Sequence, residues 1–230
     1  MSEWSDMWSP SRDAAAANNG TPLPTNFPTE TEKAPMTTTD RVYLARHGQT
    51  ALNAEGRLRG LSDPPLDDVG LEEAQRLAQV LASKHPSVVI SSPLGRAVAT
   101  ATAIARAAHV ASVVDARLND RNYGPWTGNV KAEVLEQFGS LDNAPGVEPS
   151  DAVTVRAKAA FFELLDEFRT GPLVLVSHDA INRALLGALD PRLTDIGQRT
   201  ACWNQLSRVD GVWLVEAYDQ KPTPDVDQLV

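Results

Sequence analysis

The sequence predicts an α/β protein: a three-layer α/β/α sandwich in which helices cover both faces of a mostly parallel sheet. From residue 41 onward, short apolar runs alternate with amphipathic stretches that are long enough for helices. This alternation is typical of sheets whose parallel strands are joined by crossover helices. With 230 residues, 42% of them hydrophobic, the chain is long enough to bury one substantial core.

The first half of the pattern begins with an expected strand over residues 41–46, which is followed by a helix over residues 67–85. The helical period predicts one apolar face on that helix, made of Leu71, Ala74, Leu77, Ala78 and Leu81. A second strand is expected over residues 87–92. Pro93 then precedes a helix over residues 94–109, and residues 110–118 form a third extended segment.

The second half continues with helices near residues 131–138 and 151–168. Residues 171–178 form an apolar strand that ends at a histidine, and a helix is expected over residues 179–189. The last pattern, residues 202–218, is a hairpin that turns at Asp210 and Gly211, a residue pair favoured in two-residue hairpin loops.

These patterns define one domain over residues 41–220, with a flexible tail at residues 221–230. Residues 1–40 are rich in Pro, Ser, Thr, Asn and acidic residues and have no sustained apolar period, so a disordered N-terminal extension is expected there. Two interpretations of the extension stay open: it is a natural flexible tail, or translation starts at Met36 and the preceding residues are upstream sequence.

Composition excludes several classes of partner. A formal net charge of -9 repels nucleic acid and anionic lipid over most of the surface, so neither is an expected partner. No apolar run approaches the roughly 18 residues of a membrane helix. Cys202 is the single cysteine, which excludes an internal disulfide and favours a reducing, cytoplasmic location.

Basic side chains follow three of the expected strands. Arg46 and His47 end the first, Arg96 comes shortly after the second, and His178 ends the apolar strand before residue 179. The C-terminal ends of strands in open α/β sheets form ligand sites. We therefore expect these four side chains to gather into one cationic pocket, which suits a phosphate because guanidinium groups donate paired hydrogen bonds to its oxygens.

Five segments that occur in order strengthen this interpretation: "LARHGQTALN", "GRLRGLSDPPLDDVG", "SSPLGRAVATA", "LNDRNYGPWTG" and "VSHD". Together they resemble the histidine phosphatase superfamily, the phosphoglycerate-mutase-like group, whose mark is the R-H-G tripeptide after the first strand. The resemblance runs from about residue 41 to residue 218. It implies the phosphoglycerate-mutase-like form of the predicted fold.

The resemblance implies covalent catalysis without a metal or cofactor. His47 would attack phosphorus in line, while Arg46, Arg96 and His178 would hold the phosphoryl oxygens. The arginines would oppose protonation of the imidazole and keep it nucleophilic near neutral pH. Thr50 and Asn53, on the same loop, would donate hydrogen bonds to the phosphoryl group or position the nucleophile.

The family usually takes the leaving-group proton from a glutamate before a G-x-W-x-G pattern, and Asp120 occupies that position here. To act as a general acid it must be protonated at the working pH, so burial or the substrate's charge must raise its pKa above the usual 3.9 or so. The alternative is a surface aspartate paired with Arg121.

Two further positions depart from the family pattern. Asp179 stands where glycine is common; we expect it to cap the following helix, and the alternative is that it lies near the phosphate and narrows substrate choice. Arg59, next to Gly60, stands where many relatives carry an uncharged residue. Arg57 and Arg59 would add positive charge to the mouth of the site and favour a second anionic group on the substrate, unless they form a solvated pair.

Tyr123 and Lys131 resemble residues that contact phosphoglycerate in the mutase branch, but the paired arginines of that branch are absent after residue 131. Water would then compete for the phosphohistidine, so hydrolysis of a small phosphorylated metabolite is the expected reaction. Trp126 fits core packing and the leaving-group pocket equally well. A phosphoglycerate mutase and a non-catalytic phospho-ligand sensor are the alternatives. A homodimer is compatible with the sequence, which selects no oligomeric state.

Overall fold

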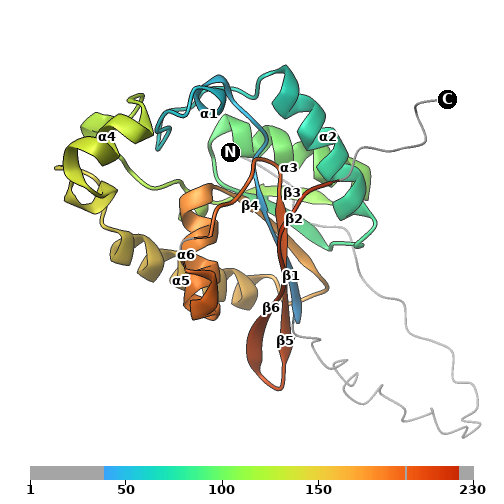
Figure 1. The fold of residues 1–230 in the computed structure, drawn as a ribbon. Helices are drawn as coiled ribbons and strands as arrows, with labels where there is room; N and C mark the ends of the chain where they lie inside the picture. The colour runs from blue at the N-terminus through green and yellow to red at the C-terminus, as the bar shows by residue number, and fades with distance from the viewer. Residues whose placement is uncertain (1–38, 195, 223–230) are drawn as a thin grey trace, which may run out of the picture. The chain divides into compact units, whose positions relative to one another are not determined.

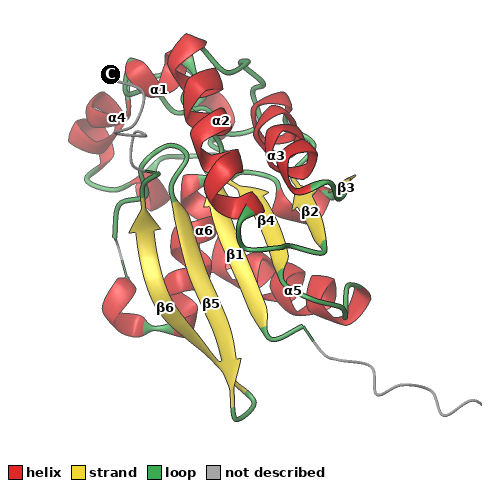
Figure 2. Ribbon diagram, turned by 90° about the vertical axis from the view of Figure 1, so that its right-hand side faces the viewer, coloured by secondary structure: helices red, strands yellow, loops and turns green. Residues whose placement is uncertain are grey.

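A mixed six-stranded sheet forms the centre of the protein in the computed structural model, which describes residues 39–194 and 196–222. The strand order is β3-β2-β4-β1-β5-β6 (Figure 2). The strands are β1 (Arg41–Arg46), β2 (Val88–Ser91), β3 (Ala111–Val114), β4 (Leu173–Ser177), β5 (Trp203–Val209) and β6 (Val212–Gln220). β4 pairs in parallel with β1 and with β2, and β2 also pairs in parallel with β3. β5 pairs antiparallel with β1, and β6 pairs antiparallel with β5. The predicted α/β class is confirmed, with an antiparallel extension at one edge.

Helices cover both faces of this sheet (Figure 1). One face carries α2 (Asp68–Ala82) and α3 (Gly95–Ala108), and the other carries α5 (Ser150–Glu167) and α6 (Asp179–Leu189). The alternation of side chains along β1 explains this arrangement. Val42 and Leu44 pack with α5 and α6, while Tyr43 and Ala45 pack with α2 and α3. Both faces of the strand are apolar because both are buried.

The apolar face predicted for α2 is correct except at its N-terminal end. Ala74, Leu77, Ala78 and Leu81 are buried, but Leu71 is 51% exposed. The first turn of α2 instead points Gly70 and Glu73 inward, where the carboxylate of Glu73 accepts a hydrogen bond from the backbone N–H of Gln49. The helix therefore begins against a loop rather than against the sheet, and that loop contact sets the direction of its first turn.

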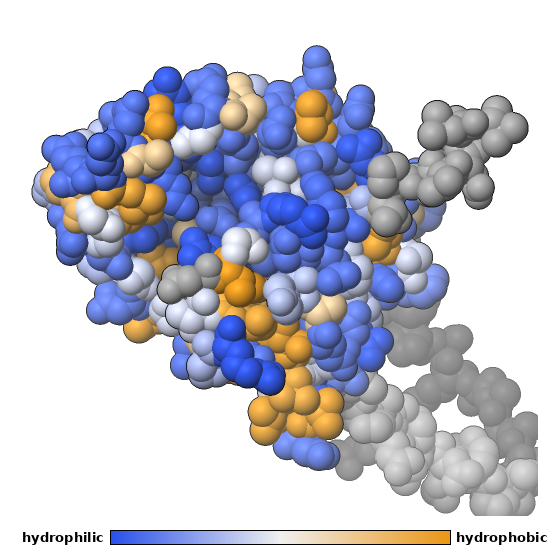
Figure 3. Space-filling view, viewed as in Figure 1, coloured by the Kyte–Doolittle hydropathy of each residue, from blue (hydrophilic) through white to orange (hydrophobic). Residues whose placement is uncertain are grey.

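The hairpin predicted at the C-terminal end is confirmed. Asp210 and Gly211 both have positive φ, 49° and 83°, which two-residue hairpin turns of type I′ require. Val209 and Val212 flank the turn and are exposed. Figure 3 shows an apolar patch near the lower end of the molecule, where the β5–β6 hairpin lies in Figure 1.

A smaller lobe lies at one end of the fold, around α4 (Lys131–Phe138) and the short helix α1 (Ala51–Ala54) (Figure 1). Its own apolar cluster is formed by Leu58, Tyr123, Val134, Ala144 and Val147. Trp126 packs against this cluster, edge-on to Phe138, and donates from Nε1 to the carbonyl of Pro145. This arrangement fits the packing interpretation of Trp126.

The expected N-terminal extension lies almost entirely outside the described residues, as does residue 223 onward of the expected tail. Within the described ranges, no helix combines the length and the hydropathy that crossing a membrane requires.

Candidate active site

The register of two neighbouring parallel strands brings the two predicted site histidines together. Arg46 at the end of β1 lies opposite Ser177 at the end of β4, so His47 and His178 follow at adjacent positions. Their ring centroids are 5.1 Å apart and both side chains are fully buried. Residues separated by 131 positions in the sequence thus form one site at the C-terminal edge of the sheet, where open α/β sheets bind ligands.

Arg96 reaches the same point from the first turn of α3. Its Nε donates to Nε2 of His47 (3.3 Å), and its Nη1 and Nη2 donate to the carbonyls of Ser62 (2.6 Å) and Gly60 (2.8 Å). Gly60 has a φ of +52°, and a Cβ added to it would lie 3.1 Å from the carbonyl oxygen of Arg121. The carbonyl of Gly60 thus holds Arg96 in place, and the assignment of Gly60 to substrate binding stays a prediction.

The hydrogen bonds of His47 define which nitrogen is nucleophilic. Nδ1 lies 2.6 Å from the carbonyl oxygen of Gly48, which can only accept, so Nδ1 carries the proton. Nε2 then keeps its lone pair and accepts from Arg96. Burial, followed by the neighbouring His178 and the positive charges of Arg46 and Arg96, lowers the pKa of His47 well below its usual range. The imidazole is therefore neutral near pH 7.

His178 is oriented by a residue that the sequence did not single out. Ser92 Oγ lies 2.7 Å from Nε2 of His178. Nδ1 of His178 is buried, has no hydrogen-bond partner among the described residues, and lies 3.8 Å from Oδ2 of Asp120. Burial and the positive charges of Arg96 and Arg46 lower the pKa of His178 well below its usual range. A neutral ring that accepts from Ser92 can donate from Nδ1 to a phosphoryl oxygen.

Asp120 lies inside this cluster and is only 3% exposed. Its Oδ2 accepts a hydrogen bond from Nη2 of Arg96 (3.2 Å), and its Oδ1 accepts from the backbone N–H of Arg121 (2.8 Å). Burial raises the pKa of Asp120 in spite of the opposing charges of Arg96 and Arg59. This is the environment that a general acid needs. The alternative of a surface pair with the Arg121 side chain is excluded, because that guanidinium binds Asp142 instead.

Arg46 contributes a further positive charge beside His47. Its side chain is 7% exposed, and Nη1 donates to the carbonyl of Gln198 in the segment before β5. Its Nε is buried without a hydrogen-bond partner in the described part of the chain. That nitrogen is available to an anion.

A pair of glycines allows the nucleophile loop to lie against α2. A Cβ on Gly48 would be 2.4 Å from the carbonyl oxygen of Gly70, and a Cβ on Gly70 would be 2.0 Å from that of Gln49. Both distances are shorter than any real Cβ contact. The glycine of the R-H-G tripeptide is thus explained by close backbone approach, which fixes the carbonyl that orients His47.

The two arginines of the "GRLRG" segment, Arg57 and Arg59, lie in different environments. Arg57 lies at the surface, where it pairs with Glu55 (2.6 Å) and donates to the carbonyl of Gly128 (2.9 Å). Arg59 is directed inward: its pKa is lowered by burial and by the charge of Arg46, and the charge of Asp120 opposes this shift. The prediction of extra positive charge at the mouth of the site therefore fits Arg59 and is wrong for Arg57.

Thr50 and Asn53 pair with each other in a capping box at the start of α1. The hydroxyl of Thr50 donates to Oδ1 of Asn53 (2.8 Å), and the same oxygen accepts from the backbone N–H of Thr50 (3.1 Å). The hydroxyl of Thr50 is thus already used within the loop. A hydrogen bond from the amide nitrogen of Asn53 to a phosphoryl group stays a prediction.

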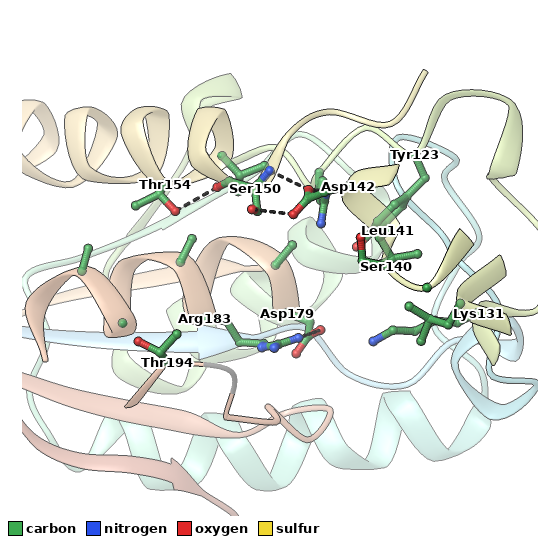
Figure 4. Close-up of a pocket in the computed structure, with 18 residues that line it drawn as sticks. Tyr123, Lys131, Ser140, Leu141, Asp142, Ser150, Thr154, Asp179, Arg183 and Thr194 are labelled. Carbon is green, nitrogen blue, oxygen red and sulfur yellow. Dashed lines mark hydrogen bonds and ion pairs between the residues drawn. The ribbon is translucent and has the colours of Figure 1, made fainter. Parts of the chain in front are cut away.

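Asp179 does not cap α6, contrary to expectation. It is the first residue of the helix; the N-cap is His178, and no side-chain hydrogen bond caps this end in the described structure. The carboxylate instead lies 3.9 Å from Nη1 of Arg183, one turn along. The side chain points into a cavity rather than back to the helix amides (Figure 4).

That cavity, which we call the leaving-group pocket, has a volume of about 610 Å³ and lies between the α4 lobe and α6. Figure 3 shows the surface hollowed beside the α4 lobe. Tyr123, Lys131 and Asp179, which the sequence assigned to substrate binding, all line it. Burial raises the pKa of Tyr123 and lowers that of Lys131. Among the described residues, no group of three His, Cys, Asp or Glu side chains is placed to hold a metal ion.

Comparison with known proteins agrees with this geometry. The chain is 34% identical over 195 residues to a glucosyl-3-phosphoglycerate phosphatase of Mycolicibacterium vanbaalenii, covering 74% of this chain and 87% of the relative. It is 33% identical over 159 residues to phosphoserine phosphatase 1 of Hydrogenobacter thermophilus, covering 65% of this chain and 75% of the relative.

Solved structures show the same fold. A mycobacterial glucosyl-3-phosphoglycerate phosphatase solved with VO3 superimposes with a TM-score of 0.72 at 27% identity, over 80% of this chain and 100% of that one. A phosphoglycerate mutase from Bacillus anthracis shares the fold with a TM-score of 0.73 at 23% identity, over 80% of this chain and 95% of that one. The family model for branch 1 of the histidine phosphatase superfamily matches residues 42–221. With this match over most of the chain and a buried pair of histidines at the matching strand ends, the protein belongs to the histidine phosphatase superfamily.

Proposed function

We propose that the protein is a phosphatase that hydrolyses small phosphomonoesters through a phosphohistidine formed on His47. The observation that carries this proposal is the state of that ring: Nδ1 donates to the Gly48 carbonyl, so Nε2 is unprotonated, and its lone pair accepts a 3.3 Å hydrogen bond from Arg96. Arg46, Arg96 and His178 surround the nitrogen at which phosphorus would bind. These groups offset the charge of a phosphoryl dianion in the transition state.

In the first step, Nε2 of His47 forms a bond to phosphorus while the bond from phosphorus to the leaving oxygen breaks. The carboxylic acid of Asp120 gives its proton to that oxygen, so the leaving group departs as an alcohol. The raised pKa of Asp120 supports this role, because burial keeps the carboxyl protonated at a higher pH than an exposed aspartate.

In the second step, the Asp120 carboxylate takes a proton from water as the water oxygen bonds to phosphorus. The bond between Nε2 and phosphorus breaks, and inorganic phosphate leaves. The enzyme returns to its starting state with Asp120 protonated and His47 neutral.

A mutase that returns the phosphoryl group to its substrate is the second candidate, favoured by the position of Tyr123 and Lys131 in the leaving-group pocket. Hydrolysis is preferred because the paired arginines of the mutase branch are absent after Lys131. Phosphoserine and glucosyl-3-phosphoglycerate, which the relatives' names specify, both carry a carboxylate and are assayed beside uncharged sugar and polyol phosphates. A small phosphorylated metabolite in the cytoplasm is the expected natural substrate.

The test uses labelled phosphomonoesters with a chelator present. Wild type is expected to acquire an acid-labile phosphoryl label and to release inorganic phosphate, while His47→Ala does neither. His109→Ala, which changes an exposed histidine at the end of α3, is the matched control and is expected to behave like wild type. Rapid isomerisation of phosphoglycerate with little phosphate release would favour the mutase. A wild-type protein that is never labelled and releases no phosphate would overturn the proposal.

A further inference from the structure

The leaving-group pocket contains opposite charges close together. Asp179 enters it from the start of α6, Arg183 from the next turn, and Lys131 from the start of α4. In Figure 4 the amine of Lys131 points toward the pair formed by Asp179 and Arg183. The carboxylate of Asp179 lies 3.9 Å from Nη1 of Arg183. A negative charge of the protein therefore already lies beside Arg183, on the side toward which Lys131 points.

The negative charge of Asp179 also changes the pKa values of Lys131 and Tyr123, two other side chains that line the pocket. Burial lowers the pKa of Lys131, and the negative charge of Asp179 opposes this shift. Burial raises the pKa of Tyr123, and the charges of Asp120 and Asp179 raise it further. Since the side chain of Asp179 is only 20% exposed, solvent screens these interactions incompletely.

The rest of the pocket is lined by an ion pair, Arg121 with Asp142, and by side-chain hydroxyl groups. Its lining includes the hydroxyl groups of Ser140, Ser150, Thr154 and Thr194. A volume of about 610 Å³ is within the usual range of about 300–1,000 Å³ for small-molecule sites, and it leaves room for a sugar or polyol. An uncharged hydroxyl group can donate to the Asp179 carboxylate, whereas a carboxylate or a second phosphate would be repelled by that carboxylate or must displace it from Arg183.

From these contacts we infer that Asp179 is a specificity-determining residue that selects phosphomonoesters with an uncharged, hydroxyl-bearing leaving group and disfavours those with a second negative charge. The inference rests on the proposed phosphatase function and adds the class of substrate to it. It also explains how an acidic residue directly after His178 is accommodated: its carboxylate lies 3.9 Å from Nη1 of Arg183, and the amine of Lys131 points toward this pair.

The test compares glycerol 3-phosphate with 3-phosphoglycerate. The two esters differ only at one carbon, which is a hydroxymethyl group in glycerol 3-phosphate and a carboxylate in 3-phosphoglycerate. Wild type is expected to prefer glycerol 3-phosphate in kcat/KM. In Asp179→Asn the ratio is expected to shift toward 3-phosphoglycerate by about tenfold, mainly through KM, as the removal of one partly screened like charge predicts. Asp179→Gly is expected to shift the ratio in the same direction.

Asp166→Asn, which removes an exposed charge from α5, is the control and is expected to leave the ratio unchanged. The ratio is taken within each variant, so a general loss of activity cancels, and Asp179→Asn keeps the shape of the side chain if the glycine variant fails to fold. An unchanged ratio in Asp179→Asn would overturn the inference while the phosphatase function stands. Failure of the wild type to hydrolyse an aryl phosphate or to become labelled would instead overturn the proposed function itself.

Discussion

At the scale of single residues, the site depends on two groups whose pKa values move toward their catalytic states for the same reason. Burial is the largest cause for both: it lowers the pKa of His47 and raises that of Asp120. Desolvation thus favours the neutral form of His47 and the protonated form of Asp120 in one buried space. A bound phosphoryl dianion would further offset the charges of Arg96 and Arg59, which oppose the shift of Asp120.

The role of Asp120 can be separated from binding by the choice of leaving group. In Asp120→Asn we expect kcat on an alkyl phosphate to fall by about 10²–10³-fold, because the departing alkoxide receives no proton. The loss on an aryl phosphate should be much smaller, since a phenolate departs without one. Equal losses on the two esters would contradict the assignment of Asp120 as the general acid.

The pH dependence provides a second readout of the same variant. Wild-type activity on the alkyl ester should fall as the pH rises through the raised pKa of Asp120, because the acid is then ionised. This decrease in activity with rising pH should be absent from the pH–rate profile of Asp120→Asn. Its persistence in the variant would mean that another group supplies the proton.

At the scale of elements, helix α5 holds Asp120, the proposed general acid, in position. Arg156 of α5 donates from Nη1 to the carbonyl of Asn119 (2.8 Å) and from Nη2 to that of Asp120 (2.9 Å). Its Nε donates to Glu148 (2.7 Å), which also accepts from the backbone N–H of Asn122 (2.9 Å). Helix α5 therefore fixes both ends of the irregular segment that carries Asp120.

Arg156→Lys should displace this segment, because an ammonium group cannot span two carbonyls and a carboxylate in the same geometry. We expect kcat on an alkyl phosphate to fall by about tenfold and kcat on an aryl phosphate to fall less, as for a misplaced acid. Arg76→Lys, an exposed change on α2, is the control. If Arg156→Lys lowers both activities equally along with the melting temperature, the role of Arg156 is structural support only.

At the scale of the whole molecule, the site makes stability depend on pH. His47 and His178 are buried and neutral, and their pKa values are lowered, whereas histidines in the unfolded chain take up protons below about pH 6.5. The unfolded state then binds more protons than the folded one, so the free energy of unfolding decreases as the pH falls below this value.

The expected decrease is up to about 1.4 kcal/mol per pH unit for each of the two histidines. Denaturant titrations between pH 7.5 and 5.5 measure it. His47→Gln should reduce the slope by about half, and the double variant with His178→Gln should remove most of it. Identical slopes in all three proteins would show that the two rings are not the groups that titrate.

Most elements follow from local signals. The apolar alternation of residues 41–46 matches β1, and residues 131–138 match α4, because periodicity and turn residues act within a few positions. The expectation for Leu71 is wrong because a loop, not the sheet, packs against the first turn of α2. The sequence predicts that Thr50 contacts the phosphoryl group or positions His47, and it does not show that the hydroxyl already donates to Asn53.

The sequence by itself determined the class of fold, the family and the chemical types in the site, since strand-end arginines and histidines are recognisable from order alone. Only the tertiary structure decided how these groups meet. The support of His178 by Ser92 and the hydrogen bond from Arg96 to Nε2 of His47 are contacts between residues far apart in the chain. Distances, burial and hydrogen-bond partners arise from packing, and packing assigns each group its protonation state.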